Sequence, residues 1–182
     1  MSSLKIGFIC GSLRADSLNR KLAQALMQIA TDRGANPVDI DLGSYGLPLY
    51  HGDLDTPASV RRLIEDCLAC DGIVIVSPEY NGSVPPVLKN AIDWTSTIST
   101  DHIKGPVYGI AACTPGPMSG IMCMRELQFL LLRLGADLVP VQVGCGNADE
   151  AFGNDGALVR ERTRDLARMM LDQMLDRIKT GR

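Results

Sequence analysis

Short apolar runs alternate with segments of helical periodicity along the chain, and this alternation constrains the fold more than any other feature. Most of the runs consist of Ile, Val and Leu with little polar alternation, which is typical of parallel strands covered on both faces. The predicted strands are residues 4–10, 38–42, 72–77, 107–113 and 137–143. Strand and helix in regular succession predict a doubly wound α/β domain with right-handed crossovers.

The helices are predicted from apolar stripes at spacings of three and four residues, such as Leu18, Leu22, Leu26 and Ile29 in the first helix. The others span about 60–68, from the proline pair 85–86 to about 94, 119–134 and 157–179. With 182 residues and no repeat or linker, the chain is expected to form one domain, residues 1–182. We expect three layers, with helices on both faces of a five-stranded parallel sheet of order 2-1-3-4-5.

Charge and hydropathy exclude several classes of protein. The net charge of −3 argues against a nucleic-acid binder, which needs a basic face. The most apolar stretch, residues 120–134, contains Arg125, Glu126 and Arg133 and is too short to span a bilayer. A start without a long apolar run predicts a cytoplasmic protein, and the six cysteines are predicted to be buried, reduced thiols.

Two polar loops are predicted at the carboxyl ends of the first and third strands, where open α/β sheets bind ligands. The first holds Ser12, Arg14, Ser17 and Asn19 before a helix, and these donors, together with the backbone N–H groups of the helix start, suit a phosphate dianion. In the alternative interpretation, Ser17 only caps the helix and Arg14 is a solvated charge. The loop matches neither the Walker A pattern nor G-x-G-x-x-G, so ATP hydrolysis and a Rossmann NAD site are not predicted.

The second loop spans residues 77–86, and Pro78 and Gly82 are expected to shape a rigid turn in it. Tyr80, Asn81 and the backbone amides can line a flat heteroaromatic ring. In the alternative, Tyr80 and Asn81 only stabilise the turn before the third helix.

The two loops and the helix after the second one resemble the NADPH-dependent FMN reductase family, whose members include quinone, chromate and azo-dye reductases of flavodoxin-like fold. The matching motifs are Gly11-Ser12-x-Arg14-x-x-Ser17-x-Asn19, Pro78-Glu79-Tyr80-Asn81-Gly82-Ser83-Val84-Pro85 and Leu88-Lys89-Asn90-Ala91-x-Asp93-Trp94. The motifs stand in the family's order, and the match runs from the first predicted strand through the fourth.

The resemblance implies a non-covalent FMN, with its phosphate held by Ser12, Arg14, Ser17 and Asn19. The residues implied for the ribityl chain and the ring edge are Pro78, Glu79, Tyr80, Asn81, Gly82 and Ser83. A third loop after the fourth strand, residues 114–120, is implied to contact the pyrimidine end of the ring through Thr114, Gly116 and Ser119. Its two prolines and Met118 depart from the more glycine-rich stretch that is frequent in the family.

The implied activity is a two-step, ping-pong reaction. NADPH or NADH passes hydride to the flavin N5, and a quinone, free flavin, azo compound or metal oxyanion then takes the electrons. The cofactor carries the chemistry, so no side chain is expected to act as acid or base and no metal is expected. One alternative is an electron-carrier flavodoxin, but such carriers share a T-x-T-G-x-T loop where this chain has Gly11-Ser12-Leu13-Arg14. The other is a signalling domain, which needs an acidic pair after the first strand, where this chain has Cys10-Gly11.

Three further features have simpler interpretations. Cys67-x-x-Cys70 lies near the end of a predicted helix, where packing is expected rather than metal or redox chemistry. Residues 42–57 form an unusually long loop, functional or mobile, in which His51 is expected to be solvated. The helix at 119–134 is apolar around most of its circumference, which predicts a homodimer or dimer-of-dimers interface; the alternative is burial under the C-terminal helix.

Overall fold

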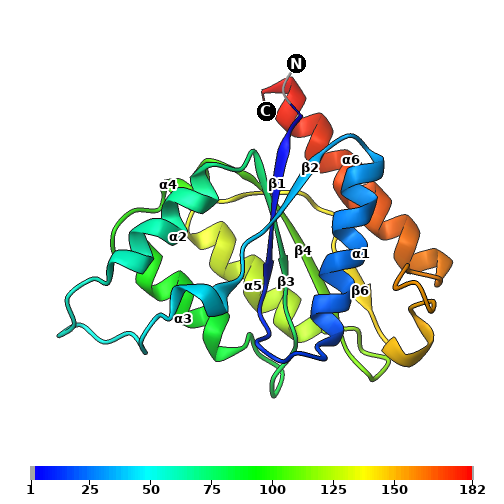
Figure 1. Ribbon diagram of the computed structural model, residues 1–182, viewed down its shortest axis with the longest axis horizontal. Helices are drawn as coiled ribbons and strands as arrows, with labels where there is room; N and C mark the ends of the chain where they lie inside the picture. The colour runs from blue at the N-terminus through cyan, green and yellow to red at the C-terminus, as the bar shows by residue number, and fades with distance from the viewer. Residues whose placement is uncertain (1–2, 182) are drawn as a thin grey trace.

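The sheet has the predicted parallel order. The computed structural model describes residues 3–181, and its strands run β2-β1-β3-β4-β5, with a sixth strand also paired to β4 (Figure 1). The strands are β1 Lys5–Cys10, β2 Asn36–Asp39, β3 Gly72–Val76, β4 Val107–Cys113, β5 Asp137–Leu138 and β6 Val143–Cys145. All pairs are parallel, so the carboxyl ends of β1, β3 and β4 lie at one end of the sheet.

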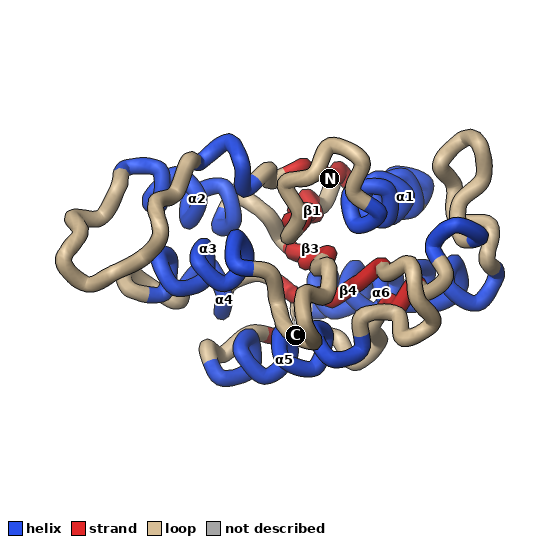
Figure 2. The backbone as a smooth tube through the Cα atoms, turned by 90° about the horizontal axis from the view of Figure 1, so that it is seen from below, coloured by secondary structure: helices blue, strands red, loops and turns tan. Residues whose placement is uncertain are grey.

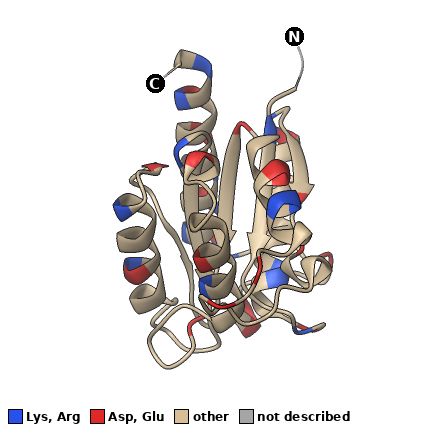
Figure 3. Ribbon diagram, turned by 90° about the vertical axis from the view of Figure 1, so that its left-hand side faces the viewer, with Lys and Arg blue, Asp and Glu red and all other residues tan. Residues whose placement is uncertain are grey.

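Helices cover both faces. They are α1 Leu18–Asp32, α2 Ala58–Leu68, α3 Pro86–Ser96, α4 Asp101–Lys104, α5 Ile121–Arg133 and α6 Glu161–Thr180, with 3₁₀-helices at Leu42–Tyr45 and Ala148–Glu150. One core cluster joins α1 and α6 to one face of the sheet, and a second joins α2, α3 and α5 to the other. Figure 2, in which the molecule of Figure 1 is seen from below, shows this three-layer arrangement. Charged residues lie mainly on the helices and loops, and the strands between them carry few (Figure 3).

The C-terminal helix does not cover α5, so the alternative in which it buries that helix is wrong. α6 packs on the opposite face of the sheet, so it does not bury α5. Cys123, Leu127 and Leu131 face the sheet, whereas Phe129 and Leu132 are 65% and 51% exposed. An exposed apolar face therefore remains on α5.

Three predicted boundaries were wrong, each for a local reason. The strand predicted at 137–143 is two short strands, β5 and β6, because Pro140 between them has no N–H to donate to the ladder. The strand predicted at 38–42 ends at Asp39, and Asp41 accepts from Gly43 N at 3.2 Å to cap the 3₁₀-helix that follows. α6 begins at Glu161 rather than 157, because residues 151–159 form a turn in which Val159 N donates to the Ala151 carbonyl at 2.9 Å.

The six cysteines are buried and unpaired, as predicted for reduced thiols. Burial raises the pKa of the Cys67 thiol to about 12, with smaller contributions from Cys70 and Asp66. Such a thiol stays protonated at neutral pH, which agrees with a packing role for the Cys67-x-x-Cys70 pair. None of the helices within residues 3–181 is long and apolar enough to cross a bilayer.

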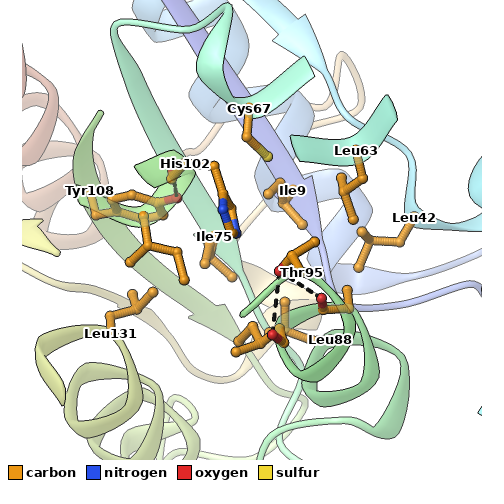
Figure 4. A pocket seen from close by; sticks show the side chains of 13 residues that line it. Ile9, Leu42, Leu63, Cys67, Ile75, Leu88, Thr95, His102, Tyr108 and Leu131 are labelled. Carbon is orange, nitrogen blue, oxygen red and sulfur yellow. Dashed lines mark hydrogen bonds between the residues drawn. The ribbon is translucent and has the colours of Figure 1, made fainter. Parts of the chain in front are cut away.

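An internal cavity of about 40 Å³ lies between the sheet and the helices α2, α3 and α5, and His102 of α4 points into it (Figure 4). His102 is only 4% exposed, and its Nδ1 atom has no hydrogen-bond partner among the described residues. Burial lowers the pKa of His102 to about 4, against smaller opposing effects of the Ser99 backbone and Asp101.

We expect the buried His102 to make the protein sensitive to acid. Its folded pKa lies below the unfolded value of about 6.5, so the unfolded chain takes up the proton first as the pH falls. The contribution of His102 to the free energy of unfolding is fully present above about pH 6.5 and is lost as the pH falls to about 4, by up to roughly 3 kcal/mol. Urea unfolding at several pH values should show that the free energy of unfolding falls more steeply with decreasing pH for the wild type than for His102→Leu. His51→Leu, at a solvated loop histidine, is the matched control and should keep the wild-type slope; equal slopes in all three proteins would rule out this role.

Candidate functional site

The loops after β1 and β3 meet at Gly11. Its N–H donates to the Val76 carbonyl at 2.9 Å, which holds the start of the first loop against the end of β3. A Cβ at this position would lie 3.0 Å from Cγ of Pro85 and 3.3 Å from Cδ of Pro78. Only a glycine lets the two loops approach this closely without displacement of the prolines.

A groove of about 340 Å³ opens where these loops meet. Its lining comes from both of them and from the start of α3: Gly11, Leu13, Arg14, Tyr80, Pro85, Pro86 and Val87. Leu13 and Tyr80 are 61% and 44% exposed, so the groove has apolar walls that reach the solvent. Two segments almost seventy residues apart in the sequence thus form one concave surface.

The first loop presents hydroxyls and a cation at the start of α1. Ser17 caps the helix by accepting from Arg20 N at 3.3 Å, and Ser12 Oγ accepts from Arg14 N at 3.4 Å. In both bonds the serine oxygen is the acceptor, and Ser12 and Ser17 are buried, at 3% and 5% exposure. The guanidinium of Arg14 pairs with no carboxylate of the described residues, whereas Arg20 is committed to Asp39 and Asp41.

Asn19 is as buried as Ser12 and Ser17, but its hydrogen bonds reach a distant strand. It is 3% exposed, its Nδ2 donates to the Cys113 carbonyl at 2.9 Å, and its Oδ1 accepts from Cys113 N at 2.8 Å. The carboxamide thus ties the first turn of α1 to the last residue of β4. The structure places Asn19 beneath the loop rather than on the groove.

The second loop is a tight hairpin. Tyr80 and Ser83 exchange backbone hydrogen bonds of 3.0 and 3.1 Å, and the two residues between them both have positive φ, 53° for Asn81 and 78° for Gly82. An Asn-Gly pair is the preferred sequence for such a type I′ turn. The hairpin brings Tyr80 to the groove, but the carboxylate of Glu79 is directed toward α5, where it accepts from two backbone N–H groups.

The third loop, residues 114–120, is held by its own polar groups. Thr114 Oγ1 donates to the Gly116 carbonyl at 3.0 Å, and Ser119 Oγ donates to the Pro117 carbonyl at 3.2 Å. Asn147 N also donates to the Gly116 carbonyl at 3.0 Å, which fastens the loop to the segment after β6. The groove described above is lined without this loop, so the structure does not bring Thr114, Gly116 and Ser119 into the wall that the first two loops share.

The long loop between the 3₁₀-helix Leu42–Tyr45 and α2 is fastened to α3. Asn90 donates to the Pro48 carbonyl at 2.9 Å and accepts from Tyr50 N at 2.8 Å, and the indole N–H of Trp94 donates to the same carbonyl at 2.7 Å. The Tyr50 and Trp94 rings meet edge to face at 5.0 Å. These bonds give Asn90 and Trp94 of the third motif a structural role. His51 in this loop is exposed, as predicted.

Sequence reasoning missed two groups of residues at this site. Leu13 and Val87 line the groove, and their apolar character inside or beside a polar loop was the only available signal. Glu126 accepts from Val84 N at 3.1 Å across 42 residues, and no local pattern indicates such a contact.

Comparison with known proteins places the chain among flavin-dependent reductases. The family model for NADPH-dependent FMN reductase matches residues 4–150. The chain is 47% identical over 176 residues to a 2-hydroxy-1,4-benzoquinone reductase of a Burkholderia species, with 94% of each chain covered. It is 36% identical over 141 residues to a quinone reductase of Escherichia coli strain K12, covering 73% of this chain and 72% of that protein.

A solved structure supports the same relationship. The flavoenzyme NAD(P)H:(acceptor) oxidoreductase of Paracoccus denitrificans superposes with a TM-score of 0.81 at 30% identity, over 97% of this chain and 98% of that one. Sequence, fold and the paired loops at the carboxyl ends of β1 and β3 thus agree, and the chain belongs to the NADPH-dependent FMN reductase family.

Proposed function

We propose that this domain, residues 1–182, binds FMN without a covalent link in the groove between its first two loops and uses NAD(P)H to reduce quinones. One observation carries this proposal: two distant loops form one groove that is lined by apolar side chains and by Arg14, whose guanidinium pairs with no carboxylate of the described residues. A phosphorylated, flat heteroaromatic molecule needs this combination.

The residues of the first loop fit a phosphate. Arg14 supplies a cation with several donors, and the Ser12 and Ser17 hydroxyls supply two more beside the amino end of α1, where the helix dipole favours an anion. Asn19 does not touch the phosphate in this account; it positions the loop by fixing α1 to the end of β4.

The second loop fits the ring. The hairpin at Tyr80–Ser83 offers backbone groups to the ring edge, and Leu13, Tyr80 and Val87 offer apolar contacts to one face of the ring and leave the other face open. Bound FMN supplies the hydride-accepting chemistry, and the chain supplies binding, orientation and electrostatics. Because the cofactor carries the redox chemistry, we assign no acid–base residue.

NAD(P)H and the acceptor are proposed to occupy the groove in turn, which gives ping-pong kinetics. Both reactants carry flat rings that need the same open face of the bound flavin, beside Leu13 and Tyr80. We favour a quinone acceptor because the apolar walls suit a neutral ring, and because quinone reduction is named for the relatives from Burkholderia and Escherichia coli.

The purified protein, reconstituted with FMN, tests this proposal. We expect the bound flavin absorption to bleach on anaerobic addition of NADPH or NADH and to return on addition of a benzoquinone. Parallel double-reciprocal plots should accompany the turnover. A protein that retains no FMN, or a bound flavin that NAD(P)H does not bleach, would contradict the assignment.

The exposed face of α5 is proposed to form a homodimer interface. Ile121, Met122, Phe129 and Leu132 lie within one stripe of the helix and are 36%, 50%, 65% and 51% exposed. These apolar side chains lie on either side of the exposed Arg125. An exposed apolar face of this kind indicates a partner surface, and a second copy presents the same face in return.

We expect Phe129→Lys to weaken the dimer at least tenfold, because a charge placed in an apolar interface is costly to desolvate. Sedimentation velocity at several micromolar concentrations measures the shift. Met169→Lys, which replaces an exposed apolar side chain on α6, is the matched control and should leave the dimer intact. A wild type that sediments as a monomer throughout would disprove the interface.

A further inference from the structure

The hairpin that forms one wall of the groove is too small to hold its own position. Only two backbone hydrogen bonds join Tyr80 to Ser83, and both residues of the turn have positive φ. An isolated two-stranded hairpin is marginally stable in water even when it is longer than this one. Its placement must therefore come from contacts on either side of the turn.

The first contact lies just before the turn. Glu79 Oε2 accepts from Met122 N at 3.0 Å and from Cys123 N at 3.1 Å, both in the first turn of α5. α5 begins after Gly120, which has no side chain to satisfy these N–H groups. A carboxylate from another loop thus caps the helix, where the helix dipole also favours negative charge.

The second contact lies just after the turn. Glu126, one turn further along α5, accepts from Val84 N at 3.1 Å through its Oε2 atom. Cys123 lies on the same helix between the two attachment points. The pKa of its thiol is raised to about 11, first by burial and then by the charges of Glu79 and Glu126, as two nearby carboxylates require.

We propose that Glu79 and Glu126 are positioning residues that clasp the Tyr80–Ser83 hairpin to α5 and thereby fix the ring-binding wall of the groove. The inference rests on the proposed function for its effect on flavin, but the clasp itself is a property of the flavin-free chain. Both contacts cross more than forty residues, and α5 starts directly after the third loop. The clasp therefore also fixes the second loop relative to the third.

Alanine variants test the clasp in two independent measurements. In the flavin-free protein, Glu79→Ala and Glu126→Ala should each speed amide hydrogen exchange at Tyr80 and Ser83, with the exchange of the core strands unchanged. In the presence of FMN, each variant should raise the dissociation constant roughly tenfold, because fewer molecules hold the binding-competent hairpin. The double variant should raise the FMN dissociation constant little more than either single variant, since both carboxylates hold the same hairpin. Glu65→Ala, an exposed carboxylate on α2, is the control and should change neither quantity.

Glutamine variants separate position from charge. Glu79→Gln and Glu126→Gln keep an oxygen that accepts the same N–H groups, so they should restore wild-type exchange and FMN affinity. Glu79→Gln also removes a negative charge from the residue that precedes Tyr80 of the groove, so the midpoint potential of the bound flavin should become more positive, whereas Glu65→Gln should leave it unchanged. A shift of this kind is not expected of a carboxylate that only stabilises the fold.

The outcomes divide cleanly. Unchanged exchange in both alanine variants would overturn the clasp whether or not the protein binds FMN. Faster exchange with an unchanged FMN dissociation constant would overturn its role at the site. A wild type that binds no FMN would contradict the proposed function instead, and the exchange measurement would still decide whether the clasp exists.

Discussion

Arg14→Ala should weaken FMN binding about ten- to a hundredfold, because a charge-assisted hydrogen bond contributes about 1.5–3 kcal/mol and each 1.4 kcal/mol is a factor of ten. Its folding should hardly change. The Arg14 guanidinium is exposed and pairs with no carboxylate of the described residues, so its removal is expected to alter the free energy of unfolding by less than about 0.5 kcal/mol. Fluorescence titration of the flavin-free protein measures the first quantity and urea unfolding the second.

Riboflavin makes this experiment specific to the phosphate. The wild type should bind FMN far more tightly than riboflavin, and Arg14→Ala should remove most of that preference. Arg61→Ala deletes the same charge from an exposed position on α2 and should retain it. If Arg14→Ala loses FMN and riboflavin equally, the arginine does not bind the phosphate.

Asn19→Leu should have the opposite pattern, with a loss of about 2–4 kcal/mol in the free energy of unfolding. The side chain is buried, and the leucine leaves the N–H and the carbonyl of Cys113 without their partner at the end of β4. An unsatisfied buried backbone group costs about 1–3 kcal/mol, so two of them account for the expected effect.

Urea unfolding without flavin distinguishes the two roles open to Asn19. Asn154→Leu, a similar replacement on an exposed loop, should change the unfolding free energy by less than about 0.5 kcal/mol. A phosphate ligand would instead give Asn19→Leu normal stability with weak FMN binding, and that result would reverse our assignment of Asn19 as a positioning residue.

The architecture was predictable because its signals are local. The apolar runs at β1, β3 and β4 and the stripes of α1 and α2 each lie within about a dozen residues. Parallel strands then bring their carboxyl ends to one edge, which is why the first two loops could be expected to meet. The prediction was wrong where a single residue acts against the run, as Pro140 does between β5 and β6.

The division of labour within the site was not predictable. Ser12, Ser17 and Asn19 look alike in sequence as polar residues of one loop, yet the partner of Asn19 lies 94 residues away on β4. Glu79 and Tyr80 are neighbours in sequence, but beside the turn at Asn81 and Gly82 the Glu79 side chain contacts α5 and the Tyr80 side chain lines the groove. Such choices depend on tertiary contacts that no periodicity records.

A crystal structure of the protein with FMN tests the central claim most directly. We predict the phosphate within hydrogen-bonding distance of Arg14 and of the Ser12 and Ser17 hydroxyls, with the ring in the groove between Leu13 and the Tyr80–Ser83 hairpin. An FMN molecule seated elsewhere, or a groove that stays empty at saturating FMN, would contradict the account.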